Sequence, residues 1–407
     1  MAEEVWMLQT KKADFKQIGA RFRIDPVTAR IIRNRGIEGE AAIDRYLNGT
    51  LDDLYDPMLL KDMERAVSIL CEAVDTGKKI RIVGDYDIDG VCSTYILLQA
   101  FERLGSDVDF EIPDRIKDGY GINESIIEQA HADGVEVILT CDNGISAFHQ
   151  VELAKKYGMT VVITDHHEVP LDGEKEKIPP ADAVIDPKQA DCPYPFPEIC
   201  GAVVAYKLVQ VLYARRGVPQ MEWLDLLEFA AIATVGDVMK LQDENRILVK
   251  YGLKKMAQTK NLGLRRLAEK NNLDLGAITA YHIGFVIGPC LNAGGRLKTA
   301  KEALALLRAQ SEEEAERLAE ELKELNDTRK DMTEQGTEAA KLQVESWYQK
   351  DKVLVVFLPE CHESLAGIIA GRLREYYQKP AIVLTRGEEA VKGSGRSIDE
   401  YHMFKKL

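Results

Sequence analysis

The sequence predicts an α/β fold with two domains: a parallel sheet in the first, a long connecting helix, and a second, smaller α/β domain. Three observations predict it. Valine- and isoleucine-rich runs alternate with amphipathic segments from residue 80 to 186, a pattern typical of a parallel sheet covered on both faces. A capped helical pattern opens at Ser311. A further strand–helix–strand pattern follows at 353–357, 365–377 and 380–385.

The elements follow one another in a clear order. Residues 1–75 have a helical pattern, and 76–300 form the first domain. Its strands are predicted at 79–85, 135–142, 159–165 and 181–186, and the stretch from 201 is mainly helical. Residues 187–197 form a proline-rich loop in which Tyr194 and Phe196 are predicted to pack rather than stack on bases.

A connecting helix is predicted within 301–350, before the partial second domain at 351–407. Ser311 and Glu314 have the spacing of a capping box. The apolar positions recur at helical spacing: Ala315, Leu318, Leu322, Leu325 and Met332. One face of this helix should therefore pack while the other is solvated, and we expect it to act as a connector without chemistry.

Composition places the chain among ordinary globular proteins. At 407 residues, a length of ~150 residues per domain suggests two to three domains. No run approaches the ~18 apolar residues of a membrane span, and the acidic, polar start lacks the apolar core of a signal peptide. The seven cysteines form no CxxC pair, which favours a reduced cytoplasm. Cys141 is predicted to be a buried small hydrophobe.

The net charge of −14 argues at first against a nucleic-acid substrate, because phosphate contacts need lysine and arginine. However, acidic side chains greatly outnumber basic ones in 311–346, so much of the excess belongs to one helix. A local basic groove remains compatible with the sequence.

Acidic side chains follow one predicted strand after another. Asp85, Asp87 and Asp89 stand in VGDYDIDGVCST, Asp142 in CDNGIS, and Asp237 in ATVGDVMKL. Asp165, His166 and His167 follow the strand at 159–165. Because the carboxyl ends of parallel strands share one edge of a sheet, these groups should converge.

Each cluster taken singly could be a turn or a packed histidine. Together, such close carboxylates repel one another unless a cation lies among them. Carboxylates suit Mg²⁺ or Mn²⁺, and imidazole favours Mn²⁺. The set is large enough for two ions that share a bridging carboxylate, which suits phosphoryl displacement.

The motifs DYDIDG, DNG, DHH and GDV, in this order, resemble those of the DHH phosphoesterase superfamily. Their surroundings, LYDPMLLKDMERAV, IPDRIKDGYGIN, YPFPEICGAVVAYKL and NAGGRL, are similar to the RecJ family of single-strand-specific exonucleases. The resemblance covers nearly the whole chain. It implies a DHH phosphoesterase domain followed by a DHHA1 domain, and 5′-to-3′ hydrolysis of single-stranded DNA to mononucleotides in repair and recombination.

The resemblance also implies roles for individual residues. Asp87, Asp89, Asp142, His166 and Asp237 would be catalytic metal ligands for two Mn²⁺ or Mg²⁺ ions, with Asp142 as the bridge. Asp85 and His167 would be further ligands or would orient one. Single-stranded DNA would be the substrate, and single-strand-binding protein and a repair helicase would be partners.

Substrate groups are implied in the same way. Arg115 and Arg296 match arginines near substrate phosphates, and guanidinium binds phosphate with two parallel hydrogen bonds. The alternative to phosphate binding is that each arginine forms an ion pair with a nearby carboxylate. Ser394, Gly395 and Arg396, in GSGRS at a strand end, would hold the 5′-terminal phosphate, with His362 close to the substrate path. Tyr120 is either a base-stacking contact or a plain loop aromatic.

Three departures from the family pattern stand out. Cys361 replaces a frequent tryptophan, and Ser364 replaces a usual glycine. Relatives continue beyond the position of Leu407 to a GGH-containing strand and usually an OB-type domain. We therefore expect an incomplete DHHA1 domain, with weaker positioning of the terminal nucleotide and weaker DNA binding.

Other functions remain open. One is a related phosphodiesterase for short oligonucleotides or cyclic dinucleotides, but those relatives lack the PDRIKDGYG and NAGGR context. Another is a catalytically inactive, truncated DNA-binding form, although such members lose carboxylates that are all present here. An inorganic pyrophosphatase is disfavoured, since that group usually has histidine where Asp85 stands.

Overall fold

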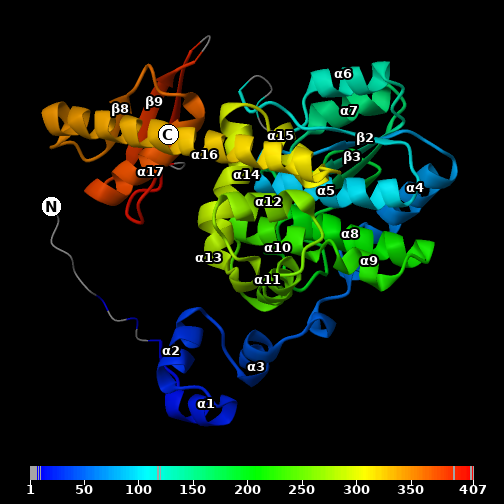
Figure 1. Cartoon of the computed structure of the whole chain (residues 1–407), viewed down its shortest axis with the longest axis horizontal. Coiled ribbons are helices and arrows are strands. Elements are labelled where there is room, and N and C mark those ends of the chain that lie inside the picture. Colours follow the sequence, from blue (N-terminus) through cyan, green and yellow to red (C-terminus); the bar gives the residue numbers. More distant parts are fainter. Residues whose placement is uncertain are drawn as a thin grey trace.

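Two α/β lobes joined by a long helix form the molecule in the computed structural model, with small N-terminal helices below the larger lobe (Figure 1). The structure describes residues 7, 9, 11–116, 119, 121–387, 390–403 and 406. Tyr120, the proposed stacking residue, lies outside them.

The first lobe contains a five-stranded parallel sheet in the order β2-β1-β3-β4-β7. Its strands are β1 (Ile80–Val83), β2 (Val108–Glu111), β3 (Val137–Cys141), β4 (Thr160–Thr164) and β7 (Ala183–Ile185). The sequence prediction of a parallel sheet, with strands within 79–85, 135–142, 159–165 and 181–186, is confirmed. The edge strand β2 was not predicted, because its side chains are only half-buried and alternate in polarity.

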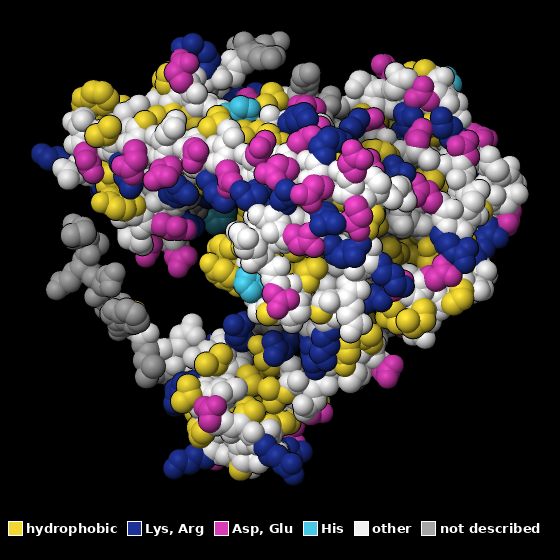
Figure 2. Space-filling view, viewed as in Figure 1, with side chains coloured by type: hydrophobic (Ala, Val, Ile, Leu, Met, Phe, Trp, Pro, Cys, Tyr) yellow, Lys and Arg dark blue, Asp and Glu magenta, His cyan; other side chains and the backbone are white. Residues whose placement is uncertain are grey.

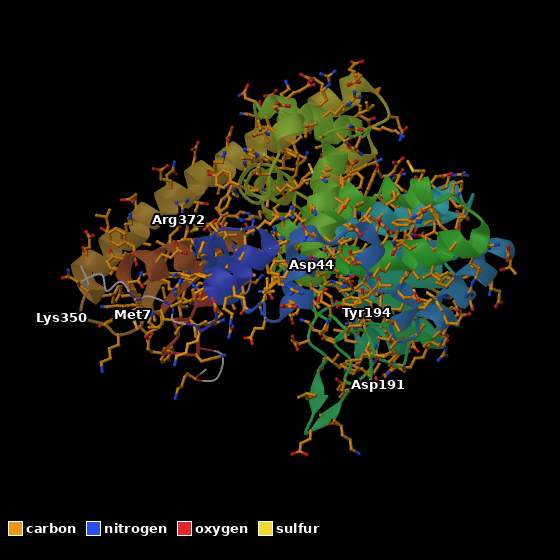
Figure 3. The ribbon with its side chains drawn as sticks, turned by 90° about the horizontal axis from the view of Figure 1, so that it is seen from below. Met7, Asp44, Asp191, Tyr194, Lys350 and Arg372 are labelled. Atoms are coloured by element: carbon orange, nitrogen blue, oxygen red, sulfur yellow. The ribbon has the colours of Figure 1, made fainter. Side chains whose placement is uncertain are left out.

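Helices cover both faces of this sheet. On one face, α4 (Met63–Asp75), α5 (Ile88–Arg103) and α8 (Gly201–Arg216) share an apolar core with alternate strand residues. On the other, α6 (Glu124–Ala132) and α7 (Phe148–Lys156) pack on the remaining strand residues. Tyr194 and Cys141 are buried and Phe196 packs against the first core, as predicted. The small hairpin of β5 (Leu171–Asp172) and β6 (Lys175–Glu176) projects from the lobe (Figure 3).

A helical layer follows α8 along the chain. It contains α9 (Gln220–Leu224), α10 (Leu227–Gly236), α11 (Asp243–Met256), α12 (Leu262–Lys270), the turn η3 (Leu275–Ala277), α13 (Ala280–His282), the π-helical turn η4 (Ile283–Ile287), α14 (Gly288–Leu297) and α15 (Lys301–Arg308). Here one expectation was wrong. Asp237 does not follow a strand, because the apolar segment before it is the buried helix α10. An apolar run alone does not distinguish a buried strand from a buried helix.

The long helix α16 (Glu312–Gln343) contacts α12, α14 and α15 in the first lobe and α17 in the second. The Ser311 hydroxyl accepts a hydrogen bond from the Glu314 amide at 3.2 Å. The Glu314 carboxylate accepts from the amide of Gln310 instead of Ser311, so one half of the predicted capping box forms. Ala315, Leu318 and Leu322 are buried.

The second lobe follows the turn η5 (Val344–Tyr348) and contains a three-stranded sheet in the order β10-β9-β8. Strand β8 (Leu354–Phe357) is parallel to β9 (Ala381–Arg386), and β10 (Val391–Arg396) is antiparallel to it. The turn η6 (Glu363–Leu365) and helix α17 (Ala366–Tyr377) connect β8 to β9. The segment GSGR forms the last four residues of β10 and ends with the strand at Arg396, so its predicted place at a strand end is confirmed.

The N-terminal helices α1 (Phe15–Phe22), α2 (Pro26–Asn34) and α3 (Glu40–Asn48) have a small core of their own around Ile32, Ile37 and Ile43. Two turns, η1 (Leu51–Asp53) and η2 (Pro57–Leu59), lead to α4. Within the described residues, no helix has the length and apolarity needed to cross a membrane. All seven cysteines are free. The division at 75, 300 and 350 stays a proposal.

Candidate metal centre and phosphate pocket

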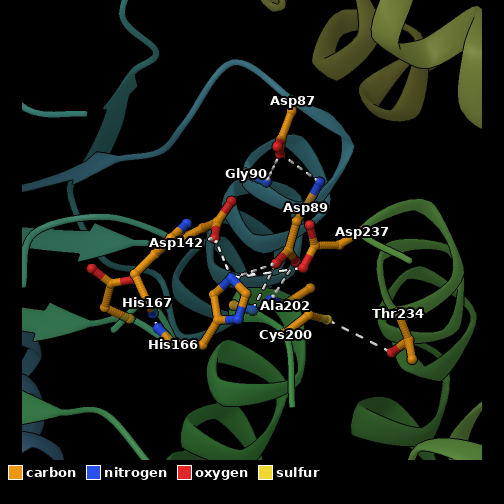
Figure 4. A network of polar contacts seen from close by, with 12 residues as sticks. Asp87, Asp89, Gly90, Asp142, His166, His167, Cys200, Ala202, Thr234 and Asp237 are labelled. Carbon is orange, nitrogen blue, oxygen red and sulfur yellow. Dashed lines mark hydrogen bonds and ion pairs between the residues drawn. The ribbon is translucent and has the colours of Figure 1, made fainter. Parts of the chain in front are cut away.

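The loop after β1 and the first turn of α5 bring Asp85, Asp87 and Asp89 to the carboxyl edge of the sheet. Figure 4 shows Asp87 and Asp89 there. Asp87 caps α5, because its Oδ1 accepts hydrogen bonds from the amides of Asp89 and Gly90 at 2.9 and 3.1 Å. A Cβ at Gly90 would lie 2.3 Å from the Asp85 carbonyl oxygen. Glycine therefore allows the helix to begin directly against the loop.

Asp89 is held by the N-terminus of α8. Its two carboxylate oxygens accept hydrogen bonds from the amides of Gly201 and Ala202, both at 2.7 Å. The partial positive charge of a helix N-terminus favours such a carboxylate. Asp89 is therefore fixed in place although it is almost fully buried.

Asp142 follows β3 with a left-handed backbone, at a φ of 61°. Such a conformation is uncommon for residues other than glycine and often marks functional sites. Gly201 packs directly against it: a Cβ there would lie 2.7 Å from the Asp142 Cβ. The close approach of α8 therefore fixes both Asp89 and Asp142.

The two histidines face this carboxylate group from the end of β4. His166 Nε2 lies 3.1 Å from Asp142 Oδ1, 3.5 Å from Asp89 Oδ2 and 3.9 Å from Asp237 Oδ2. His167 Nδ1 lies 2.7 Å from Asp165 Oδ1 and 4.0 Å from Asp142 Oδ1. Asp237 thus joins the cluster from the end of α10 rather than from the sheet.

Burial disfavours the charged forms of these groups. It raises the pKa of Asp142 well above its usual value, and the charges of Asp89 and Asp87 add to this. Burial, with the charge of Asp87, raises the pKa of Asp85 to about 8. Burial and Asp89 raise the pKa of Asp237 to about 7. A bound cation would reverse these shifts, since it favours the charged carboxylates.

The pKa values of the two histidines shift in opposite directions. Burial lowers the pKa of His166, which favours the neutral imidazole that binds metals. Burial also opposes charge on His167, but the hydrogen bond that its ring donates to the Asp165 carboxylate outweighs burial and raises the pKa of His167 to about 9.

The donor set fits divalent metal ions. Three groups have ligand atoms within 4.8 Å of one another: Asp85, Asp87 and Asp142; Asp89, His166 and Asp237; and Asp142, His166 and His167. The Oδ1 atom of Asp85 is buried and has no hydrogen-bond partner among the described residues. Asp142 and His166 each belong to two groups. Of the two, the Asp142 carboxylate has the two oxygens that a ligand needs to bridge a pair of ions.

A second pocket, of about 320 Å³, opens beside the metal centre between the two lobes. Among its lining residues are Tyr86, Arg115, Arg296, Ser394 and Arg396. The Arg296 guanidinium donates to the Ser364 carbonyl at 3.1 Å. Burial, reinforced by Arg115, lowers the pKa of Arg296 to about 10.

The arginines of this pocket are available to an anion. Within the described chain, no ion pair involves Arg115, Arg296 or Arg396. Gly367 of α17 leaves the room that Arg396 needs, because a Cβ there would lie 2.8 Å from the guanidinium. Guanidinium groups without carboxylate partners suit a phosphate.

Two predicted substrate residues are not among those that line this pocket. Gly395 is one of them, and an added Cβ there would meet Met403. His362 lines a neighbouring apolar pocket beside α16, and its Nδ1 lies 2.7 Å from the Ser364 hydroxyl.

Sequence reasoning placed Asp165 in the cluster but gave it no role. Asp165 accepts hydrogen bonds from the amides of Ile145, His166 and His167 and also contacts the His167 ring. Sequence reasoning missed the pair of α8 amides that holds Asp89, for which no side chain in the sequence gives a signal.

The fold and this edge of acidic and imidazole groups are those of a phosphoesterase class. Residues 79–234 match the family described as DHH family, N-terminal domain. The match covers all five strands of the parallel sheet and ends before Asp237.

Curated relatives extend the match over nearly the whole chain. The single-stranded-DNA-specific exonuclease RecJ of Bacillus subtilis is 36% identical over 99% of this chain and 50% of its own length. RecJ of Haemophilus influenzae is 35% identical over 95% of this chain and 68% of its own length. The chain belongs to the RecJ family. It spans half of the first relative and about two thirds of the second.

Solved structures agree. A crystal structure of exonuclease RecJ bound to manganese superposes with a TM-score of 0.74 at 32% identity, over 85% of this chain and 84% of that one. RecJ of Thermus thermophilus in complex with Mn²⁺ superposes with a TM-score of 0.78 at 30% identity, over 94% of this chain and 53% of that one.

Proposed function

We propose that the chain is a metal-dependent 5′-to-3′ exonuclease that hydrolyses single-stranded DNA to mononucleotides in repair and recombination. One observation carries the proposal: Tyr86 lines the phosphate pocket, and it stands in the chain between Asp85 and Asp87. A 5′-terminal phosphate in the pocket therefore places the next phosphodiester beside the carboxylates. Cleavage there releases one nucleotide at a time.

Asp87, Asp89, Asp142, His166 and Asp237 would hold two ions, with Asp142 as the bridge and Asp85 and His167 beside them. The imidazole ligand favours Mn²⁺ over Mg²⁺. When bound, such a pair of ions supplies activation of a water molecule and stabilisation of the attacking and leaving oxygens at phosphorus.

The protein groups orient the substrate and the ligands. Arg115, Arg296 and Arg396, with the Ser394 hydroxyl, bind the terminal phosphate. Asp165 holds the His167 ring, and the N-terminus of α8 holds Asp89. In the reaction, the oxygen of water bonds to phosphorus, the bond from phosphorus to the 3′ oxygen breaks, and that oxygen ends protonated.

Family membership also supports a proposal for the partners and the cellular compartment. Single-strand-binding protein and a repair helicase would act beside this enzyme by supplying single strands. The free cysteines are consistent with the reducing cytoplasm.

The test is the release of labelled mononucleotide from a 5′-phosphorylated single strand, with Mn²⁺ and with EDTA. A matching duplex and a cyclic dinucleotide serve as competing substrates. We expect Mn²⁺-dependent release from the single strand only. Preferred cleavage of the cyclic dinucleotide would instead assign the chain to the related phosphodiesterases, and no release despite bound Mn²⁺ would refute the exonuclease.

A further inference from the structure

Two aromatic rings lie exposed on the first lobe. Tyr281 of α13 is 64% exposed and Phe285 of η4 is 69% exposed. Their ring centroids are 4.8 Å apart and their planes are inclined by 28°, so the rings are stacked on each other. Figure 2 shows hydrophobic side chains over α13, at the edge of the hollow below the second lobe. Exposed apolar side chains that lie together in a patch mark interaction sites more often than single exposed apolar side chains do.

The helical segment that carries these rings runs along the metal centre. An added Cβ at Gly284 would lie 3.6 Å from Val235, close to the end of α10 that leads to Asp237. An added Cβ at Gly288 would lie 3.3 Å from Ile88, which stands between Asp87 and Asp89. An added Cβ at Gly295 would lie 2.2 Å from the carbonyl oxygen of Tyr86, which stands between Asp85 and Asp87. Along the segment, the three contacts therefore follow in the order Val235, Ile88 and Tyr86.

One end of the segment is aromatic and the other is positively charged. The exposed rings lie at its start, and Arg296 of the phosphate pocket lies near its end. At 1.5 Å per residue, Phe285 and Arg296 are roughly 16 Å apart along the axis. Ile88 and Tyr86, which stand beside the carboxylates in the chain, contact the part between them. Phosphate pocket, metal centre and aromatic pair therefore follow one line.

Two local features indicate that this surface is functional. The rings stand at a π-helical turn, a conformation that is frequent at functional sites. Beside Asp237, Val238 is 87% exposed and has a left-handed backbone with a φ of 58°. For a β-branched residue this conformation is strained, and it holds a further apolar side chain outward next to a metal ligand.

We propose that Tyr281 and Phe285 form a platform on which the substrate bases stack on the 3′ side of the scissile phosphate. The inference rests on the proposed function, since the 5′-terminal phosphate then occupies the Arg296 end and the remaining strand leaves over the rings. Stacking on aromatic side chains is tolerant of sequence. It also favours single strands, because the bases of a duplex are already stacked and paired.

The test compares two substrates of the double variant Tyr281→Ala/Phe285→Ala. The first is a 5′-phosphorylated oligo-dT. The second is 5′-phosphorylated thymidine whose 3′-phosphodiester carries a methyl group instead of the remaining strand. We expect the KM for oligo-dT to rise about ten-fold or more, from the known effect of removing a stacking ring, and kinetics on the methyl ester to stay unchanged. Trp347→Ala, which removes another exposed aromatic ring at 73% exposure, should change neither.

The outcomes separate the two proposals. If the unaltered chain cleaves neither substrate, the proposed exonuclease fails. If it cleaves both and the double variant keeps its KM for oligo-dT, or loses activity equally on both, the platform is refuted. A change of oligomeric state in the double variant would assign the rings to a contact between chains and would also refute it.

A binding measurement does not depend on turnover. EDTA prevents hydrolysis, and Phe285→Trp adds a tryptophan at the platform. Oligo-dT should then quench the fluorescence of this variant more than that of the unaltered chain, and a duplex should not. Unchanged fluorescence at saturating oligo-dT would overturn the proposal.

Discussion

Gly201 is the position where a single methyl group should damage the metal centre most selectively. Its amide donates to Asp89 at 2.7 Å. A Cβ at this residue would lie 2.7 Å from the Asp142 Cβ and 2.9 Å from both its Cα and its Oδ1. Gly201→Ala therefore pushes the start of α8 away from Asp142 and pulls an amide away from Asp89.

The size of the effect follows from these contacts. Carbon atoms normally approach to about 3.5–4.0 Å, so the helix or Asp142 must move by roughly 1 Å. A misplacement of that size at a catalytic site lowers activity about 100-fold, and overpacking of this kind reduces the free energy of unfolding by about 1–3 kcal/mol. We expect the loss of activity mainly in kcat, because the substitution leaves the phosphate pocket unchanged.

The assay is mononucleotide release under saturating Mn²⁺, together with the midpoint of urea unfolding. Gly371→Ala is the matched control: this glycine also lies in a helix, and an added Cβ there meets nothing within 4 Å. The control should keep full activity and gain up to about 1 kcal/mol of stability. Equal activity of Gly201→Ala and the control would refute the close packing of α8 on the metal centre.

Three further predictions concern the metal bridge, the phosphate pocket and a buried acid. Asp142→Ala should abolish hydrolysis, since among the described residues Asp142 is the one carboxylate that belongs to two of the ligand groups; retained activity with Mn²⁺ would contradict the shared ligand. Arg396→Ala should weaken the preference for 5′-phosphorylated over 5′-hydroxyl ends without changing Mn²⁺ affinity, and an unchanged preference would place the phosphate elsewhere. Burial raises the pKa of Glu228 from 4.5 to about 7, so its stabilising contribution is complete below 4.5 and is lost as pH rises through about 7. In urea unfolding, Glu228→Gln should remove that decline, which amounts to about 3 kcal/mol; an identical pH dependence would refute the assignment.

The buried strands were predictable because their side chains leave little choice. The runs that became β1, β3, β4 and β7 are rich in valine and isoleucine and too short for helices. Strand β2 lies at the edge with half-buried side chains, so its sequence shows no continuous apolar run. The segment before Asp237 is apolar on all sides, and only the tertiary structure shows that it is a helix.

The metal cluster was predictable because side chains form it, and topology gathers the ends of parallel strands. What holds the cluster was not predictable. The amides of Gly201 and Ala202 bind Asp89 through the backbone, so no residue type signals them. The resemblance identified the GSGR segment, but only the structure shows that Ser394 and Arg396 line the same pocket as Arg115 and Arg296.

The central claim is that this cluster binds two ions close together. Titration with Mn²⁺, followed by calorimetry and electron paramagnetic resonance, tests it most directly. The account predicts two Mn²⁺ ions per chain with the spectrum of a magnetically coupled pair, and loss of the coupling in Asp142→Ala. One ion per chain, or two ions without coupling in the unaltered chain, would contradict it.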